Sequence, residues 1–215
     1  MTKKELYNRC SQYFSQALPK AETELHFSSP YQLLVAVMLS AQCTDRRVNM
    51  VTPALFEAYP TIRDMSSATP GDILPFVKSV SYPNAKAGHL VAMAKQVVER
   101  FDGRIPDDMD ELVSLPGVGR KTANVMLAVA FGGNAMPVDT HVFRVSHRIG
   151  LVPPRCTTPL SVEKELVKYF PNDTLSLAHH WLLLHGRYVC TARSPKCGSC
   201  GLTDVCRHFR EKDRG

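Results

Sequence analysis

Four of the seven cysteines lie close together near the end of the chain, with the spacing C-x6-C-x2-C-x5-C. They are Cys190, Cys197, Cys200 and Cys206. In a chain that shows no secretory signal, such a group is more often a metal site than a set of disulfides. Structural zinc commonly uses closely spaced cysteine pairs, whereas the wide outer gaps of this group suit a loop around an iron–sulfur cubane. The spacing therefore predicts a metal, with iron–sulfur favoured and zinc as the alternative.

A second candidate for chemistry is Lys121, which stands on the first turn of an otherwise apolar helix in VSLPGVGRKTANVMLAVAF, residues 113–131. The helix dipole makes this end unfavourable for a cation. Partial burial and positive surroundings would further favour the neutral amine, which is a nucleophile able to form a Schiff base. The alternative is a solvated or phosphate-binding lysine.

A carboxylate follows eighteen residues after this lysine, at Asp139 in the stretch VDTHVFRV, residues 138–145. Asp139 is placed to cap a helix that begins near Thr140, and capping is the commoner role for an aspartate in such a position. Capping also orients the carboxylate, so that one residue can both close a helix and face a reacting group. We expect His141 to pack or to form hydrogen bonds only.

The turn before Lys121 is built for a tight reversal of the chain. Pro116 ends a short helix over 108–114, and Gly117 and Gly119 allow backbone conformations that are closed to other residues. The next helix then starts near Gly119, where its first amides and its dipole favour an anion such as a phosphate. The alternative is a plain corner between two packed helices.

The elements that position these residues are predicted to be helices throughout, because apolar residues recur at three- and four-residue spacing and no alternating strand pattern occurs. The fold class is therefore all-α. Gly132-Gly133 is the best candidate for a domain edge. The expected helices span 3–18, 30–42, 45–58, 70–79, 84–102, 108–114, 119–132, 140–149, 161–170 and 174–189.

The composition favours an anionic partner, since the 215 residues carry a formal net charge of +6 and a sequence pI near 9.0. Residues 187–214 contribute +4 of this charge, from seven basic and three acidic residues. The longest apolar runs have seven residues, far short of the ~20 that span a bilayer. With no signal peptide at the N-terminus, we expect a cytoplasmic protein without a membrane partner.

Taken together, LPGVGRKTA (115–123), VDTHVFRV and the cysteine spacing resemble the endonuclease III family, which are iron–sulfur DNA glycosylases of the helix-hairpin-helix superfamily. The resemblance covers nearly the whole chain. It implies that Lys121 attacks C1′ of a damaged nucleotide, displaces the base, and forms an imine that undergoes β-elimination. It implies that Asp139 helps to deprotonate the lysine or stabilises charge on the sugar, and that the four cysteines bind a [4Fe-4S] cluster.

The same resemblance assigns DNA contacts. It implies that the turn and the start of the next helix grip the DNA backbone, and that a glutamine in LSAQCTD (39–45) fills the space left by the extruded nucleotide. In SYPNAKA (81–87) the chain departs from the family's G-L-Y-N-x-K-A, because a tyrosine replaces the inserted leucine and a proline follows it. This leaves the preferred lesion and opposite base open. The expected DNA-binding residues are Gln42, Tyr82, Gly117, Val118, Gly119, Arg120 and Thr122.

The resemblance therefore implies a bifunctional DNA glycosylase and abasic-site lyase that removes oxidised pyrimidines from duplex DNA during base excision repair. We expect a monomer, associated with the nucleoid if bacterial. The expected domains are a helical bundle over 22–133, with the helix-hairpin-helix at about 108–131, and an iron–sulfur domain from 1–21 and 134–215.

Two alternatives remain. An adenine glycosylase of the same superfamily would usually have a small residue in place of Lys121. A DNA-binding module with a structural metal and no chemistry would need neither Lys121 nor Asp139.

Overall fold

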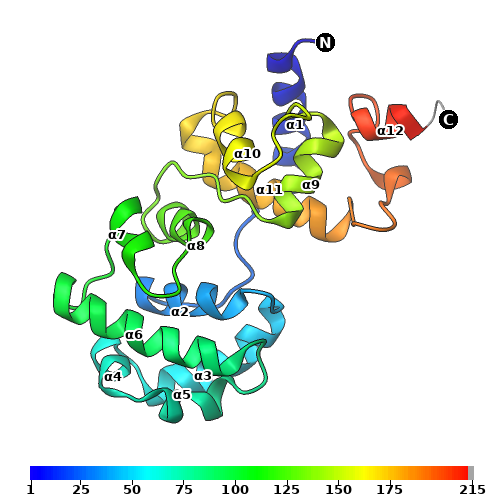
Figure 1. Cartoon of the computed structure of the whole chain (residues 1–215). Helices are drawn as coiled ribbons and strands as arrows, with labels where there is room; N and C mark the ends of the chain where they lie inside the picture. Colours follow the sequence, from blue (N-terminus) through cyan, green and yellow to red (C-terminus); the bar gives the residue numbers. More distant parts are fainter. Residues whose placement is uncertain (213–215) are drawn as a thin grey trace. The chain divides into compact units, whose positions relative to one another are not determined.

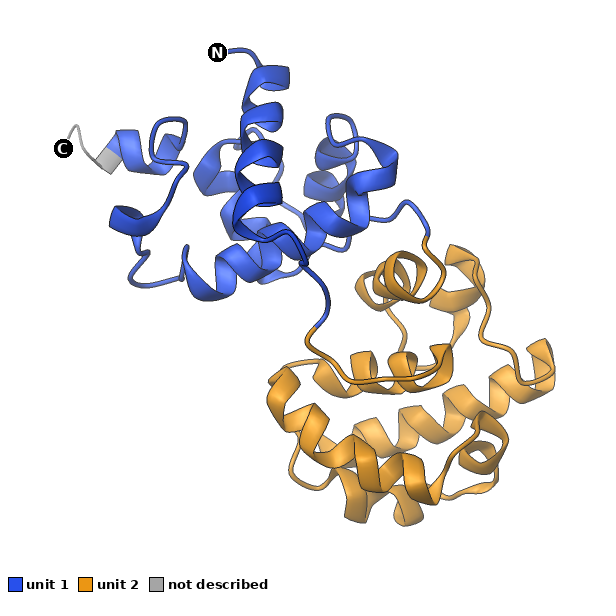
Figure 2. Ribbon diagram, turned by 180° about the vertical axis from the view of Figure 1, so that it is seen from behind, with its two compact units in different colours: residues 1–23, 133–215 blue, residues 24–132 orange. Residues whose placement is uncertain are grey.

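The structure, a computed structural model, describes residues 1–212; Asp213 and Arg214 of the basic C-terminal stretch lie outside the described residues. Helices and turns make up the fold, and the described residues contain no strand (Figure 1). The prediction of an all-α protein is confirmed. The chain forms two compact units, Glu24–Gly132 and a second unit that joins Met1–Thr23 to the segment beginning at Gly133 (Figure 2).

The unit Glu24–Gly132 is built around one almost wholly buried helix, α2. This helix packs against α3, α6, α8 and the π-helical segment η1, and Leu33, Leu34 and Leu39 have no exposed surface. Although α2 is so apolar, no helix among the described residues is long and apolar enough to cross a membrane. The elements of this unit are α2 (Pro30–Ser40), α3 (Asp45–Ala58), α4 (Ile62–Ser67), α5 (Pro70–Val77), α6 (Pro83–Phe101), α7 (Met109–Ser114), α8 (Arg120–Val125) and η1 (Met126–Ala130).

Side-chain caps fix where several of these helices begin. The hydroxyl of Ser29 accepts a hydrogen bond from the Gln32 amide, and Pro30 follows at the first helical position of α2. The Thr44 hydroxyl accepts a hydrogen bond from the Arg47 amide in the same way and caps α3, so that only four residues separate α2 from α3. The segment between these helices, residues 41–44, is therefore short, and the Thr44 cap fixes where it ends.

The last expected helix of this unit, 119–132, differs from the prediction in its second half. The α-helical part ends at Val125, and a π-helical segment continues from Met126 to Ala130. A π turn adds one residue to one turn of helix, so it barely changes the spacing of apolar residues. The spacing in the sequence therefore could not distinguish the two kinds of helix.

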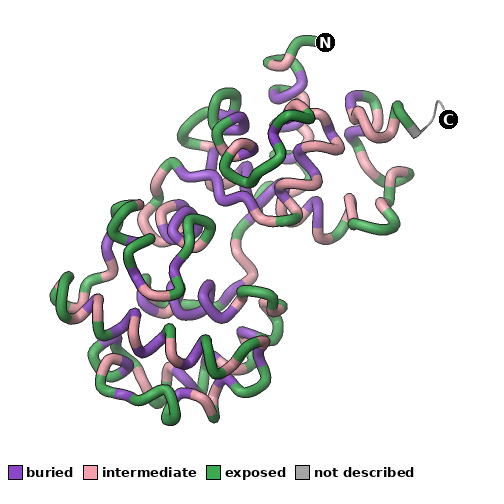
Figure 3. The backbone as a smooth tube through the Cα atoms, viewed as in Figure 1, coloured by how far each residue is buried: buried purple, intermediate pink, exposed green. Residues whose placement is uncertain are grey.

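The second unit joins helix α1 to the C-terminal part of the chain, and its apolar core combines the two segments (Figures 2 and 3). Phe14 of α1 has no exposed surface, stacks on Trp181 of α11 at a ring distance of 6.0 Å, and meets His185 edge-on at 5.2 Å. Arg9 of α1 pairs with Asp204 at 3.1 Å. The elements are α1 (Lys3–Ala17), α9 (Thr140–Ile149), α10 (Pro159–Leu166), η2 (Asn172–Thr174), α11 (Leu175–Tyr188), η3 (Cys197–Ser199) and α12 (Arg207–Lys212).

Candidate functional site

The helical hairpin, residues 108–131, reverses direction at a turn that contains two glycines with different backbone conformations. Gly117 has a φ of 75°, in the left-handed region, and the Val118 amide donates to the Leu115 carbonyl at 3.1 Å. Gly119 has an ordinary extended backbone, with a φ of −94°, and forms the N-cap of α8 without a side-chain cap. An added Cβ at Gly119 would meet nothing within 4 Å. The packing of this chain therefore leaves open space beside the main chain at Gly119.

Lys121 follows Gly119 by two residues and lies in the first turn of α8, as expected. Its side chain is exposed, so the partial burial expected from the sequence is not found. Arg120 is also exposed, Val118 is buried, and Thr122 is half-buried. The hairpin thus presents two cations and a glycine on the outside of a well-packed turn.

Asp139 is half-buried and caps α9. Its Oδ1 accepts a hydrogen bond from the Val142 amide at 2.8 Å. Its backbone carbonyl accepts a further hydrogen bond, from the Phe143 amide, at the start of the helix. The cap fixes the carboxylate at the first turn of α9, as the sequence predicted. Lys121 belongs to the unit Glu24–Gly132 and Asp139 to the other unit.

His141 serves the packing of α9, as expected. Its Nδ1 lies 3.2 Å from the guanidinium of Arg144, and its Cβ is so close to Gly186 of α11 that a side chain there would clash at 2.9 Å. This part of α9 is therefore occupied by helix packing.

Gln42 and Tyr82 come from different connections of the same unit, and the structure brings these connections together. We name them the Gln42 loop, residues 41–44, and the Tyr82 loop, residues 78–82. The Ser81 hydroxyl donates to the Gln42 carbonyl at 2.6 Å. Both Gln42 and Tyr82 are exposed and have a φ of 55°, which is unusual for residues other than glycine.

Sequence analysis assigned no role to Lys86, which the structure places beneath these two loops. Lys86 is buried, and its ammonium donates to the carbonyls of Leu39 and Ala41 at 2.7 Å each. A signal was readable: Lys86 falls one helical turn after Tyr82 and one turn before the apolar Leu90, on a face that must be buried.

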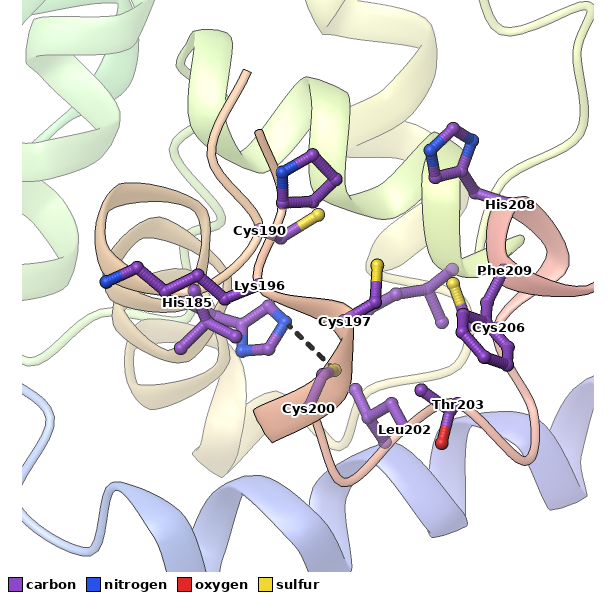
Figure 4. A pocket seen from close by; sticks show the side chains of 13 residues that line it. His185, Cys190, Lys196, Cys197, Cys200, Leu202, Thr203, Cys206, His208 and Phe209 are labelled. Carbon is purple, nitrogen blue, oxygen red and sulfur yellow. Dashed lines mark hydrogen bonds between the residues drawn. The ribbon is translucent and has the colours of Figure 1, made fainter. Parts of the chain in front are cut away.

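The four clustered cysteines line one pocket in the cysteine loop, residues 190–206 (Figure 4). Apolar side chains such as Ile149 and Leu202 and polar ones such as His185 and His208 complete its wall. Two arginines of α9 hold the start of the loop: Arg144 donates to the Cys190 carbonyl at 3.2 Å and Arg148 to the Thr191 and Ala192 carbonyls at 2.7 Å each. The loop is thus anchored to the helix that Asp139 caps.

The four thiols fit a cubane cluster in number and kind. All four cysteines line the same pocket, and a cubane takes one thiolate for each of its four iron atoms. Burial raises the pKa of the Cys200 and Cys206 thiols, so a bound cation must replace the proton for the thiolates to form.

Some of the basic residues beside this loop are used by the fold itself. Arg207 donates to the His147 carbonyl at 2.7 Å and lies 3.9 Å from Glu211, and Arg210 donates to the Val205 carbonyl at 2.9 Å. Arg193 and Lys196, within the cysteine loop, are exposed. Arg210 of α12 is exposed as well, so both the loop and α12 carry positive charge at the surface of this unit.

Comparison with known proteins agrees with these features. Residues 35–172 match the HhH-GPD superfamily of base excision DNA repair proteins, and residues 190–206 match the iron–sulfur binding domain of endonuclease III. Endonuclease III of Rickettsia felis is 44% identical over 205 residues, which cover 95% of each protein. Endonuclease III of Escherichia coli K12 is 42% identical over 195 residues, or 91% of this chain and 92% of that protein.

Two solved structures match over the whole length of both chains. A trapped endonuclease III–DNA covalent intermediate with an estranged adenine has a TM-score of 0.93 at 41% identity. A non-covalent endonuclease III–DNA complex has a TM-score of 0.94 at 40% identity. The chain therefore belongs to the endonuclease III family. Its cofactor is a [4Fe-4S] cluster, and the preference for iron–sulfur over zinc is confirmed.

Proposed function

We infer that the chain is a bifunctional DNA glycosylase and abasic-site lyase of base excision repair. The observation that carries this inference is an exposed lysine, Lys121, two residues after a glycine whose Cα faces open space, on the DNA-binding hairpin of the family. A relative 41% identical has been solved as a covalent intermediate with DNA. Such an intermediate needs a nucleophile, and an amine is the group that forms it with a sugar carbon.

Lys121 supplies that amine. Its Nζ attacks C1′ as the glycosidic bond breaks, and the base leaves with the bonding electron pair and takes up a proton. The C1′–O4′ bond of the sugar ring then breaks, O4′ takes up a proton as Nζ loses one, and an imine forms between Nζ and C1′. Loss of a proton from C2′ then breaks the bond between C3′ and its oxygen, which nicks the strand. Water finally releases the lysine, so that two easier steps replace one hard one.

Asp139 supports the same step from a fixed position. Breaking the glycosidic bond builds positive charge on the sugar, which a carboxylate stabilises. The attack also requires Lys121 to lose a proton, which a carboxylate accepts. The cap on Val142 holds the Asp139 side chain for either role, and both roles predict the loss of base excision when its charge is removed.

The hairpin binds the DNA backbone. The open space at Gly119 lets a phosphate approach the main chain closely, and the exposed Arg120 adds positive charge beside it. Gln42 and Tyr82, on their paired loops, fill the gap left by the extruded nucleotide. Because Tyr82 is 64% exposed, its ring is available to stack between bases. The substrate class is duplex DNA with oxidised pyrimidines or abasic sites, and the protein acts as a monomer.

Cys190, Cys197, Cys200 and Cys206 are the ligands of the cluster. The cluster ties the cysteine loop into one rigid element, and the lysine chemistry requires no electron transfer. Arg193 and Lys196 of this loop face solvent and add phosphate contacts, each of which makes binding more sensitive to salt.

The test is borohydride trapping on a duplex with one thymine glycol and on an abasic duplex. The wild-type protein is expected to form an adduct with both. Lys121→Gln should form neither adduct and keep its affinity for the abasic duplex within about tenfold, because one lysine contributes a small part of the phosphate contacts. An adduct with the abasic duplex alone would support the lyase activity but refute the oxidised pyrimidine as the substrate for base excision. No adduct on either would refute the proposed function.

A further inference from the structure

The start of helix α6 and the end of helix α2 are joined by one buried side chain. Lys86 lies in the first turn of α6, where its amide donates to the Tyr82 carbonyl at 3.1 Å. Its ammonium reaches the other helix and donates to the carbonyls of Leu39 and Ala41 at 2.7 Å each. Ala41 directly precedes Gln42. Lys86 is thus bonded to the backbone of both loops that carry the proposed DNA-inserting residues.

The position of the Lys86 ammonium at the end of α2 is electrostatically favourable, but the burial of its charge is unfavourable. The last carbonyls of a helix have no partner within the helix and carry the negative end of its dipole, which a cation stabilises. Lysine is rarely buried without a compensating reason, and burial lowers the pKa of Lys86. An apolar residue would fill the same space more cheaply, so the two hydrogen bonds are the feature that needs explanation.

The loops themselves need to be held. Gln42 and Tyr82 both sit in the left-handed region with a φ of 55°, which disfavours residues with a Cβ atom. Such conformations persist only when the surroundings impose them. Here the surroundings are Lys86 on one side and Ser81 on the other, because the Ser81 hydroxyl donates to the Gln42 carbonyl at 2.6 Å.

We propose that Lys86 is a positioning residue that fixes Gln42 and Tyr82 as a preformed pair, so that both enter the DNA together when a nucleotide is extruded. This proposal rests on the proposed function, in which these two side chains fill the vacated space. A preformed pair meets the gap without first ordering two loops, and it therefore lowers the cost of holding the nucleotide out of the stack. A single strand leaves no gap to fill, so the benefit exists only on duplex DNA.

The experiment compares two substrates in single-turnover reactions. One is a duplex with a single thymine glycol, and the other is a single strand with an abasic site. Lys86→Met keeps a similar apolar stem and removes the ammonium. We expect it to slow reaction on the duplex by about tenfold to a hundredfold, as for a misplaced positioning group, and to leave the single-strand reaction near the wild-type rate. Lys95→Met, on an exposed position of the same helix α6, is the matched control and should change neither.

A double-mutant cycle tests whether Lys86 acts through Gln42. If it does, Lys86→Met should have little further effect in a Gln42→Ala background, because the side chain that Lys86 positions is already gone. Should Lys86→Met fail to fold, Ser81→Ala removes the second tie at an exposed bond and must show the same selective loss on the duplex.

Equal slowing on both substrates, full additivity with Gln42→Ala, or an unchanged duplex rate in Lys86→Met or in Ser81→Ala would overturn the positioning role. Failure of the wild-type protein to react with either substrate would instead refute the proposed function. The two failures are therefore distinct.

Discussion

Gly117 packs directly against His89. A Cβ atom added at Gly117 would lie 2.8 Å from the Cβ of His89 and 2.9 Å from its ring carbon Cγ, and the φ of 75° at this position already disfavours a side chain. Two residues further on, the same addition at Gly119 would meet no atom within 4 Å. Packing therefore requires a glycine at 117 but not at 119, where the proposed role is to let the DNA backbone approach.

Gly119→Ala should separate DNA binding from stability. The free energy of unfolding is expected to change by less than about 1 kcal/mol, since only the cap residue of α8 changes. The dissociation constant for an abasic duplex should rise about tenfold, because a methyl group then occupies the space that a phosphate approaches. Fluorescence anisotropy with a labelled duplex and urea denaturation measure the two quantities. Gly117→Ala is the matched control and should lower the free energy of unfolding by about 1–3 kcal/mol.

Asp139 has a capping role and a proposed chemical role, which two substitutions can separate. Asparagine caps helices as well as aspartate does, so Asp139→Asn should leave the free energy of unfolding nearly unchanged, whereas Asp139→Ala should lower it by about 1 kcal/mol. Both should reduce the single-turnover rate of base excision by about a hundredfold or more, because the carboxylate charge is gone in each. If Asp139→Asn retained the full rate, the residue would be only a cap.

The ligand role of the cysteine loop predicts a difference between two cysteines of the same unit. Cys200→Ala should lose iron and the visible absorption of the cluster, and it should unfold at lower temperature than the wild type. Cys10→Ala should keep both iron and absorption, because Cys10 lies in the apolar core with no exposed surface, where burial raises its pKa to about 12. Loss of iron from the Cys10 variant, or its retention in the Cys200 variant, would contradict the assigned ligands.

His180 makes the stability of its unit depend on pH. Burial lowers the pKa of His180 below its ordinary value of 6.5, so the folded state binds fewer protons than the unfolded chain does. The stabilising contribution is therefore complete above pH 6.5 and is lost as the pH falls toward the folded-state pKa. His180→Gln should reduce this dependence in urea denaturation at a series of pH values. Part of the pH dependence should remain in this variant, because burial also lowers the pKa of His185, to about 4. An identical pH profile in the variant would refute the prediction.

The spacing of apolar residues and the positions of proline, glycine and capping residues were enough to predict the fold class and the hairpin. The proline and two glycines of the reversal are read directly from the sequence, and the Asp139 cap follows from its place before α9. Short helices were missed: α4 begins with a capping box from Thr61 to Asp64 that was readable, whereas α12 has few apolar residues to mark it.

Other features of the site could not be predicted from local sequence. Nothing about a glutamine or a tyrosine indicates a left-handed backbone, because at Gln42 and Tyr82 the neighbouring helix ends impose it. The role of Lys86 depends on carbonyls that are 45 and 47 residues away in the chain. The exposure of Lys121 likewise depends on how the hairpin packs, and spacing carries no information about it.

The unit that contains the cysteine loop takes its core from both parts of the chain, and this has a consequence for synthesis. Arg9 of α1 and its partner Asp204 are 195 residues apart, so at about 5–20 residues per second a ribosome needs about 10–40 s to make the second after the first. All core residues of the unit Glu24–Gly132 have by then been made. During that interval the apolar face of α1, which includes Tyr7 and Phe14, lacks the C-terminal residues against which it packs in the folded protein. The docking of α1 and the completion of the cysteine loop therefore both depend on the last part of the chain to be synthesised.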